Sequence, residues 1–347
     1  MSNLSVIVRG QRSHLQPLAY PALASLFATG ISLVTAKQDA DLVLFGHPRD
    51  LIAAKVEMFD LIRLRPQTRI VLLSEEPYWD TVGAITPFQR QQSLHTESGL
   101  LPFTFLNHHT SAIFDFAKIP YFLLTQHHYS TRYAQRFRRN QCKTPDDWAA
   151  HFKDSAVWAA FVVERRISER VDVAFADHDV KGLSLWRTKL AEACETGNVL
   201  RLGKGWPVGS QDRRQLIDWH LDKLLFLDGA CRFVSAIENT HQQNYLSEKL
   251  FDAFAVGAVP LYFASPLHSV HRMVPANSWL NLYGMTVQEA VNAIDGMVLD
   301  TVFLEQYCLA QNILAKTFND TALLVAERER VRRAIVDEFC KILASGH

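Results

Sequence analysis

The sequence has no net charge, few cysteines and no long hydrophobic run. Lysine plus arginine and aspartate plus glutamate number 36 each, so the overall charge gives no sign of a nucleic-acid partner. The five cysteines are scattered without a CxxC pair, which favours reduced thiols over a disulfide framework. The most apolar stretch, 250–267, is interrupted by Asp252 and Pro260 and is too short to span a membrane. We expect a cytoplasmic protein without a secretion signal, and we leave open a peripheral contact with the inner membrane.

What the sequence does contain is a regular alternation of short β-rich runs and helix-length segments. The runs expected as strands are residues 5–8, 41–45, 69–73, 103–106, 157–163, 199–202, 232–237 and 259–263. The segments expected as helices are residues 48–64, 183–194, 212–226 and 245–256. This alternation predicts an α/β fold with parallel sheets covered on both faces. With 347 residues, the chain is long enough for two such domains facing a central cleft.

Polar residues between 140 and 156 indicate a domain boundary, because a helix-start pattern there precedes a new strand. We therefore predict domains over 1–150 and 151–320, followed by a helical segment over 321–347. Residues 331, 335, 339 and 342 of that segment are apolar and lie on one helical face. Acidic residues nearly cancel its arginines, which favours a helix packed on the body over one lying on a membrane surface.

The segment 232–263 has the pattern strand, polar loop, helix and strand, with its polar residues gathered at one end. Free N–H groups at the helix start favour an anion. Lys249 can add a charge for a phosphate, and Glu248 can accept hydrogen bonds from a ribose diol. The alternative is that Ser247 and Glu248 only cap the helix and Lys249 is solvated.

Four stretches of this region resemble the signature of the glycosyltransferase family 10 α-1,3-fucosyltransferases, of the bacterial type. Residues 237–240 read Ile-Glu-Asn-Thr, 245–250 read Tyr-Leu-Ser-Glu-Lys-Leu, 257–262 read Gly-Ala-Val-Pro-Leu-Tyr and 275–281 read Pro-Ala-Asn-Ser-Trp-Leu-Asn. The resemblance implies a GT-B fold of two Rossmann-like domains, with the acceptor bound by the N-terminal domain and a GDP-sugar by the C-terminal one. Cys231-Arg232 and the stretch 282–285, Leu-Tyr-Gly-Met, depart from the family pattern, and these departures leave the choice of donor sugar open.

The resemblance also implies roles for residues of the donor half. Contacts with the nucleoside are implied for Asn239, Tyr245 and Glu248, and a contact with the diphosphate is implied for Lys249. Residues 183–192 are similar to a family helix that carries a phosphate-binding arginine, which makes Arg187 a candidate, with a surface arginine as the alternative. Lys204, in the turn Gly203–Trp206, is a weaker phosphate candidate.

An acidic pair follows the strand expected at 69–73. Glu75-Glu76-Pro77 resembles the family's Glu-Ser-Pro segment, whose glutamate is taken as the general base of an inverting displacement. Aligning the three residues on that tripeptide selects Glu75, with Glu76 in the serine's place as the second choice. Because a proline follows, both glutamates leave the strand and project into a loop. The alternative is that both glutamates are solvated turn residues.

Residues 103–113 resemble, with several changes, a stretch of the same family that lies on the acceptor side. The resemblance implies that Asn107, His108 and His109 line the acceptor site. The family's arginine and aspartate are absent from this stretch, so we expect a different acceptor. The histidine pairs 108–109 and 127–128 do not have metal-ligand spacing, and neighbouring residues in extended structure point to opposite faces. Residues 177–179, Asp-His-Asp, look like a metal-holding DxD element but lie in a polar link, where an acidic loop is the simpler interpretation.

The sequence therefore predicts an inverting glycosyltransferase that needs no metal or other cofactor. The expected reaction moves fucose from GDP-fucose to a hydroxyl of a glycan such as lipopolysaccharide or another surface glycan. Two alternatives stay open: the same machinery with another GDP-hexose such as GDP-mannose, and a non-catalytic nucleotide-binding scaffold.

Overall fold

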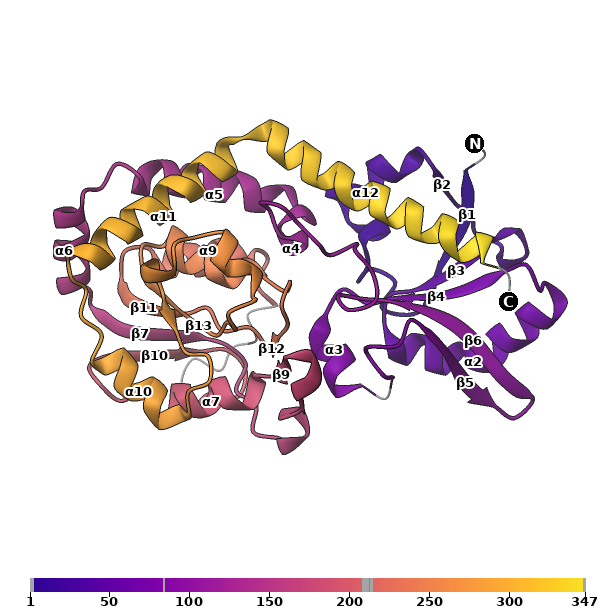
Figure 1. The fold of residues 1–347 in the computed structure, drawn as a ribbon, viewed down its shortest axis with the longest axis horizontal. Helices are drawn as coiled ribbons and strands as arrows, with labels where there is room; N and C mark the ends of the chain where they lie inside the picture. Colours follow the sequence, from indigo (N-terminus) through magenta and orange to yellow (C-terminus); the bar gives the residue numbers. More distant parts are fainter. Residues whose placement is uncertain (1–2, 84, 208–211, 213–214, 346–347) are drawn as a thin grey trace. The chain divides into compact units, whose positions relative to one another are not determined.

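The computed structural model describes residues 3–83, 85–207, 212 and 215–345. The chain divides into two compact units, of which the first contains Met1–His127 and Ala322–His347 and the second contains His128–Thr321 (Figure 1). Each unit is built on a mainly parallel sheet with helices packed against it. The predicted α/β fold class is therefore confirmed in both units.

The sheet of the first unit has the strand order β2-β1-β3-β4-β6-β5. Its strands are β1 (Leu4–Arg9), β2 (Ile31–Leu33), β3 (Leu42–Phe45), β4 (Arg69–Leu73), β5 (Gln91–Thr96) and β6 (Gly99–Leu106). Its α-helices are α1 (Pro21–Ala24), α2 (Pro48–Leu64), α3 (Pro77–Val82), α4 (Tyr121–Leu124) and α12 (Thr321–Ala344). The pairings are parallel except for the hairpin of β5 with β6, which the sequence analysis did not predict in full.

Both faces of this sheet are buried at its centre, which explains why β3 and β4 read as continuous hydrophobic runs. All four residues of β3 are fully buried, although successive side chains point to opposite faces. The α2 helix covers one face and contributes Leu51, Met58 and Leu61 to a core shared with the strands. His47 caps α2 by accepting a hydrogen bond from the Arg49 amide at 3.1 Å, and Pro48 occupies the first helical position.

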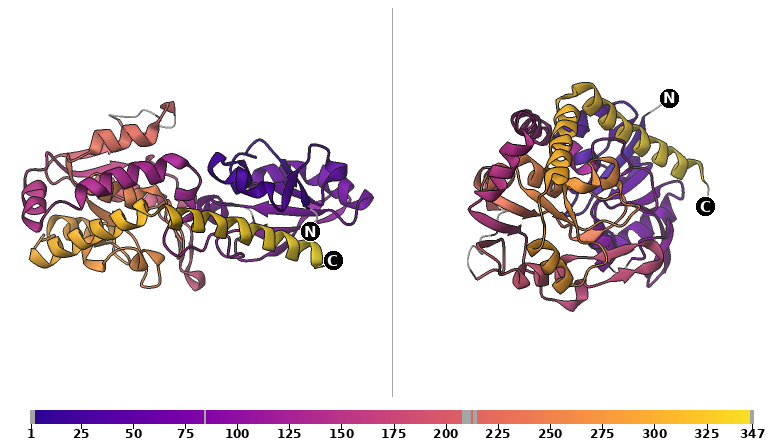
Figure 2. Two further views of the ribbon diagram at one scale, coloured as in Figure 1. Left: turned by 90° about the horizontal axis from the view of Figure 1, so that it is seen from above. Right: turned by 60° about the vertical axis from the view of Figure 1, so that its left-hand side comes forward.

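The terminal helix α12 packs on the first unit through the stripe predicted from the sequence (Figures 1 and 2). Val331, Ile335, Phe339 and Ile342 are all buried. Glu327, which is 3% exposed, accepts hydrogen bonds from the backbone amides of residues 117, 118 and 119 at 2.9, 2.7 and 3.3 Å. The helix thus belongs to the first unit even though it follows the second in sequence.

Replacing Glu327 by alanine is expected to lower the free energy of unfolding by about 3 kcal/mol, because three backbone N–H groups lose their charged acceptor. Urea denaturation measures the change. The control is Glu329→Ala on the same helix. Among the described residues Glu329 pairs with Arg332 and Arg333 alone, and it is partly exposed, so its loss should cost less than about 1 kcal/mol. Equal effects of the two changes would contradict the anchoring role of Glu327.

The sheet of the second unit has the strand order β10-β7-β11-β13-β14, with parallel neighbours throughout. The strands are β7 (Val157–Val162), β10 (Val199–Leu202), β11 (Cys231–Ser235), β13 (Val259–Tyr262) and β14 (Leu280–Asn281). A small antiparallel sheet is formed by β8 (Ala174–Phe175), β9 (Val180–Gly182) and β12 (Thr240–His241). The predicted strands at 157–163, 199–202, 232–237 and 259–263 are all present.

The helices of the second unit cover both faces of its sheet (Figure 1). They are α5 (His127–Asn140), α6 (Pro145–Lys153), α7 (Ser184–Ala193), α8 (Trp219–Leu227), α9 (Glu248–Ala255), α10 (Val287–Asp295) and α11 (Thr301–Asn319). The helix expected at 212–226 is the shorter α8, and residues 213 and 214 of that prediction lie outside the described residues.

The division of the chain differs from the predicted limits of 1–150 and 151–320, because α5 and α6 belong to the second unit. Trp148 and Phe152 of α6 make edge-to-face contacts with Tyr307 of α11. The side chain of Asn140, at the end of α5, donates to the carbonyl of Phe254 at 3.1 Å. The polar link that suggested a boundary is therefore a connection between two helices that pack within one unit.

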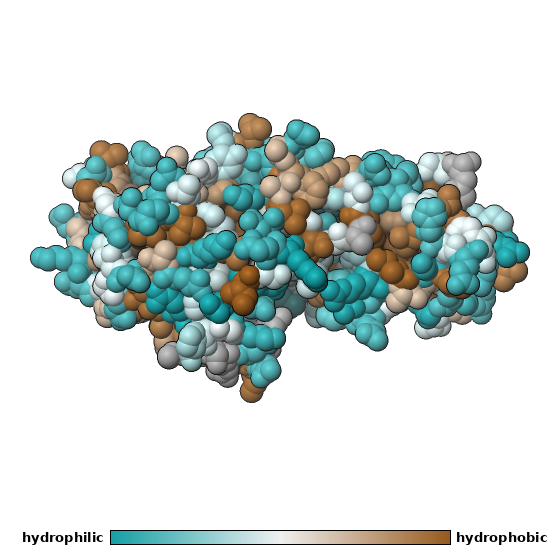
Figure 3. Space-filling view, turned by 90° about the horizontal axis from the view of Figure 1, so that it is seen from below, coloured by the Kyte–Doolittle hydropathy of each residue, from teal (hydrophilic) through white to brown (hydrophobic). Residues whose placement is uncertain are grey.

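On the face drawn in Figure 3, apolar side chains lie in small groups among polar ones. Single exposed apolar residues of this kind are normal for folded proteins. Among the described residues, no helix has both the length and the hydrophobicity required to cross a membrane.

Candidate functional site

A pocket of about 250 Å³ opens in the second unit beyond the carboxyl ends of β7 and β10. The chain enters this sheet at β7, adds β10 on one side and then β11 on the other, so the strand order reverses at β7. Ligands of parallel sheets bind at such a reversal. The lining of the pocket includes Arg187, Lys204, Lys223, Glu248 and Lys249.

The turn after β10 gives the pocket one of its walls. Gly203 has a φ of 124°, and a side chain at this position would meet the carbonyl oxygen of Val163 at 2.6 Å. Glycine is therefore required for the turn to approach β7 so closely. Lys204 follows it and is exposed. The structure thus places Lys204 on the pocket, and its contact with a phosphate stays a prediction.

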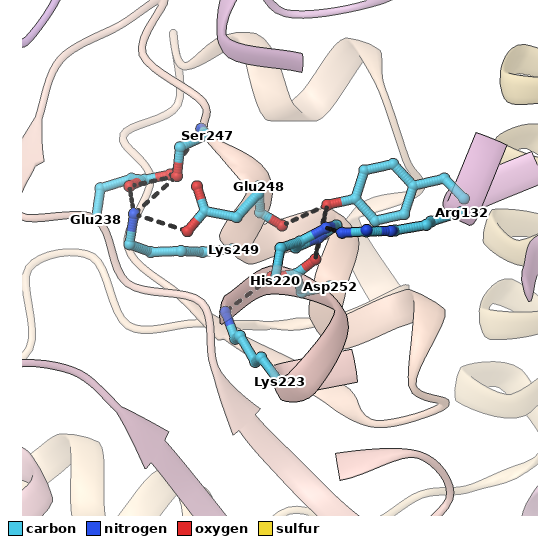
Figure 4. A network of polar contacts seen from close by, with 9 residues as sticks. Arg132, His220, Lys223, Glu238, Ser247, Glu248, Lys249 and Asp252 are labelled. Carbon is cyan, nitrogen blue, oxygen red and sulfur yellow. Dashed lines mark hydrogen bonds and ion pairs between the residues drawn. The ribbon is translucent and has the colours of Figure 1, made fainter. Parts of the chain in front are cut away.

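Lys249 lies at the start of α9 and is held by two side chains (Figure 4). Its ammonium group donates to Glu238 Oε2 and to Ser247 Oγ, each at 2.8 Å. Burial opposes the charge of Lys249, but Glu238 and Glu248 outweigh it and raise the pKa of Lys249 above its ordinary value. The lysine is thus a fixed cation on the wall of the pocket, and it is not a solvated side chain.

Ser247 and Glu238 form the support for this cation. Ser247 occupies the N-cap position of α9, yet its hydroxyl bonds to Glu238 Oε1 at 2.7 Å and not to a helix amide. Glu238 is 3% exposed and also accepts from the Ser247 amide at 2.8 Å. The alternative that Ser247 only caps the helix is therefore wrong for its side chain. Glu238 was missed as a site residue, although it stands in the Ile-Glu-Asn-Thr motif.

Glu248 is buried beside Lys249, with 3.5 Å between its Oε1 and the lysine Nζ. Burial opposes ionisation of Glu248, but Lys249 and Lys223 hold the pKa of its carboxyl group below the ordinary value. The group is therefore an acceptor at neutral pH, as binding of a ribose diol would require.

Arg187 of α7 is 5% exposed and lines the same pocket as Lys249. One of its guanidinium nitrogens donates to the carbonyl of Ile237 at 3.2 Å. The alternative of a surface arginine is therefore wrong. Because a guanidinium cannot be deprotonated at neutral pH, this side chain provides a permanent charge at the pocket.

Asn239 and Tyr245 are not among the lining residues recorded for this pocket. The backbone carbonyl of Asn239 accepts from the amide of Leu183 at 2.8 Å, which joins the loop to the start of α7. Tyr245 is 4% exposed. Their predicted contact with a nucleoside stays a prediction.

A second buried ion pair, missed in the sequence analysis, adjoins the pocket (Figure 4). Lys223 of α8 lies 2.8 Å from the fully buried carboxylate of Asp252 in α9. The sequence holds one signal for it, since a carboxylate within the apolar stretch 250–267 needs a partner. Nothing in the sequence identified which residue that partner would be.

In the first unit, the carboxyl end of β4 delivers Glu75 to a pair of tyrosines. The hydroxyl of Tyr121 donates to Glu75 Oε2 at 2.7 Å, and that of Tyr20 donates to Oε1. Burial raises the pKa of Glu75 to about 7; the two tyrosine hydrogen bonds act in the opposite direction, and Glu76 raises it further. Such a carboxyl group suits general-base work near neutral pH. The alternative of a solvated turn residue is wrong for Glu75.

The predicted acceptor-side residues lie after β6, beside this carboxyl group. His108 Nε2 is 3.1 Å from the carbonyl oxygen of Glu75, and its ring stacks on Phe114. Burial lowers the pKa of His108 to about 3, so the ring is neutral. His109 is half-buried against Phe88. A role for either histidine in contacting an acceptor stays a prediction.

Asn107 was predicted to line the acceptor, but it is fully buried and its side chain bonds to the backbone of its own turn and to a neighbouring loop. Its amide group donates to the carbonyl of Pro87 at 2.9 Å, and its oxygen accepts from the backbone amides of His109 and Thr110. These bonds make Asn107 a structural residue of the turn that carries the two histidines.

The last residue of the acidic Asp-His-Asp element at 177–179 makes hydrogen-bonding contacts within the second unit. Asp179 has a φ of 50°, and its carboxylate accepts from Tyr283 at 3.0 Å and lies 3.3 Å from His241 Nε2. Over the described part of the chain, no group of three or more His, Cys, Asp or Glu side chains could hold a metal ion. The expectation that transfer needs no metal stays a prediction.

A known protein family matches part of the second unit. Residues 211–308 match the profile described as glycosyltransferase family 10 (fucosyltransferase), C-terminal part. Crystal structures of an alpha1,3-fucosyltransferase with GDP-fucose, without ligand and with GDP are 13%, 15% and 12% identical to this chain, with TM-scores of 0.47, 0.47 and 0.42. Each alignment covers 99% of this chain and 91% of the other. Comparison with curated proteins gives no match. The four motifs at 237–240, 245–250, 257–262 and 275–281 all lie within the matched residues.

Proposed function

We propose that the enzyme transfers fucose from GDP-fucose to a hydroxyl of a glycan acceptor, with inversion at the anomeric carbon. The observation that carries this proposal is the pocket in which Arg187, Glu248 and Lys249 converge within and beside the family 10 segment. Its charged groups suit a ribose and a diphosphate, which are the parts common to GDP-sugars. The family match favours fucose as the sugar.

The proposed reaction breaks the bond between the anomeric carbon and the β-phosphate oxygen while the acceptor oxygen bonds to that carbon. The electron pair of the broken bond leaves with GDP, and fixed cations stabilise the charge that develops on the diphosphate. Arg187 and Lys249 are the cations assigned to this task, with Lys204 as a third contact from the exposed turn. Glu248 accepts hydrogen bonds from the ribose hydroxyls.

Glu75 is assigned as the base that takes the proton of the acceptor hydroxyl. Its carboxyl group is held by Tyr20 and Tyr121 and is only half-buried, so an acceptor can reach it. His108 and His109 are assigned to the acceptor side, and a lipopolysaccharide or other surface glycan is the proposed acceptor class. A peripheral contact with the inner membrane would bring the enzyme to a lipid-linked acceptor of this class.

Replacing Lys249 by methionine is expected to weaken GDP binding by about 1.5–3 kcal/mol, the usual contribution of a hydrogen bond to a charged group. Glu238 keeps both its hydrogen bonds from Ser247 in this variant, so the support of the site remains. Titration calorimetry measures the dissociation constant. Lys316→Met is the control, because Lys316 is an exposed residue of α11 outside the pocket. An unchanged constant for Lys249→Met would exclude the phosphate role.

The donor sugar is tested by following GDP release with GDP-fucose and with GDP-mannose in the presence of glycan acceptors. Faster release with GDP-fucose supports the proposal, and faster release with GDP-mannose selects the other GDP-hexose. Binding of GDP without transfer from either donor would support the scaffold alternative.

A further inference from the structure

Asp252 is an ionised carboxylate in the interior of the second unit. It is fully buried within α9, and three side chains surround it: Lys223 at 2.8 Å, His220 at 2.8 Å and Tyr133 at 2.7 Å. A buried charge of this kind is costly unless it is paired and hydrogen-bonded. Burial opposes its ionisation, but Lys223 and His220 outweigh burial and hold the pKa of Asp252 below the ordinary value.

The partner of this carboxylate reaches the donor pocket. The Lys223 side chain is 5% exposed, and the residue belongs to the lining of the pocket together with Glu248 and Lys249. An ammonium group has three N–H donors. Among the described residues, Asp252 is the one polar partner recorded for the Lys223 side chain, so N–H donors remain for a ligand in the pocket.

Lys223 repeats the construction of Lys249. Each lysine lines the same pocket, and each is paired at 2.8 Å with a carboxylate that is at least 97% buried, Asp252 in one case and Glu238 in the other. The two carboxylates lie behind the ammonium groups and fix their positions. Such preorganised cations need no rearrangement when a charged ligand arrives.

We propose that Lys223 is a second lysine ligand of the donor's diphosphate, and that Asp252 is the positioning residue that holds its ammonium group at the pocket. The inference rests on the proposed GDP-sugar function. It adds a contact from α8, a helix that carries none of the motif residues at 237–250.

A further layer of side chains fixes the orientation of Asp252 (Figure 4). His220 Nδ1 lies 3.0 Å from a guanidinium nitrogen of Arg132, and Arg132 pairs with Asp218. Because a guanidinium can only donate, Nδ1 must accept, and the ring proton is therefore on Nε2, where it donates to Asp252. Lys223 pairs with the other oxygen of the Asp252 carboxylate.

The test compares binding of GDP and of guanosine to the full-length protein by titration calorimetry. The decisive variant is the double change Lys223→Met with Asp252→Asn, since it removes one positive and one negative charge and leaves no buried carboxylate unpaired. The introduced amide can still bond to Tyr133 and His220. Asp252→Asn alone keeps the amine but removes its anchor. Lys189→Met is the control, because Lys189 of α7 is 51% exposed and lies outside the pocket.

We expect the double variant to bind GDP roughly ten- to a hundredfold more weakly, with guanosine affinity unchanged. Asp252→Asn should show a smaller loss that is again confined to GDP, because a misplaced amine affects only the phosphates. Wild-type GDP affinity in the double variant would overturn the inference about Lys223 and leave the proposed function intact. Equal losses of affinity for GDP and for guanosine would do the same. Failure of the wild-type protein to bind GDP would overturn both.

Discussion

Replacing Glu75 by glutamine is expected to lower the rate of transfer by about 10²–10⁴-fold, the usual contribution of a positioned general base. Glutamine keeps the size of the side chain and can still accept a hydrogen bond from Tyr20 or Tyr121. It cannot take up a proton from the acceptor hydroxyl. The rate should therefore fall while the dissociation constant for GDP, whose pocket lies in the other unit, stays the same.

The neighbouring glutamate is the matched control for this change. Glu76 lies at the N-cap position of α3, one residue beyond Glu75, and Glu76→Gln should keep most of the wild-type rate. Steady-state rates and GDP titrations on both variants separate the outcomes. If Glu76→Gln abolished transfer and Glu75→Gln did not, the base would be Glu76, the second choice from the sequence. Wild-type rates in both variants would show that neither Glu75 nor Glu76 is the general base.

The rate of transfer is also expected to fall as pH falls below about 7. Burial raises the pKa of Glu75 to about 7, whereas the tyrosine hydrogen bonds lower it and Glu76 raises it. The base acts in its ionised form, and that form declines about tenfold per pH unit below the pKa. At pH 5, kcat/KM should therefore be roughly a hundredfold below its plateau. A rate that stays constant down to pH 5 would contradict the assignment of Glu75.

Tyr121→Phe tests the origin of this pH dependence. Removing a hydrogen bond to the ionised carboxylate favours the protonated form, so the acid limb of the profile should move to higher pH. Tyr307→Phe is the control, because the hydroxyl of this buried tyrosine also makes a hydrogen bond, at 2.9 Å to the carbonyl of Ala258 in the other unit. A merely structural effect of Tyr121→Phe would lower the rate at every pH without moving the profile.

Local pattern was sufficient to predict much of the fold. The continuous apolar run of β3 and the helical apolar stripe of α12 both follow from the periodicity of one segment. The hairpin strand β5 was missed, since its residues 91–96 alternate in exposure on an edge strand and are mostly polar. The domain boundary was misplaced because α5 and α6 are joined by a polar link, while their apolar faces pack on residues far ahead in the chain.

Part of the donor side could also be predicted from local pattern, because some of its residues lie close together in the sequence. Lys249 and Glu248 lie next to each other at the start of one helix, so their proximity follows from the motif. Glu238 lies in the same strand–loop–helix unit but was missed, because its bond to Lys249 depends on how the loop folds. Arg187 was assigned by resemblance alone, and its burial against Ile237 came from the packing of α7. Asn107 was expected to face an acceptor, but the turn after β6 needs its side chain for three backbone groups.

By itself the sequence determined the α/β class, the terminal helix and the motifs that lie within the match to the family 10 profile, because each depends on the order of residues within one segment. Only the tertiary structure decided which separate segments meet. It brought Tyr20 and Tyr121 to Glu75, and it paired Lys223 with Asp252. These pairings depend on how helices and strands pack, and in each case desolvation requires a buried charge to find its partner from another part of the chain.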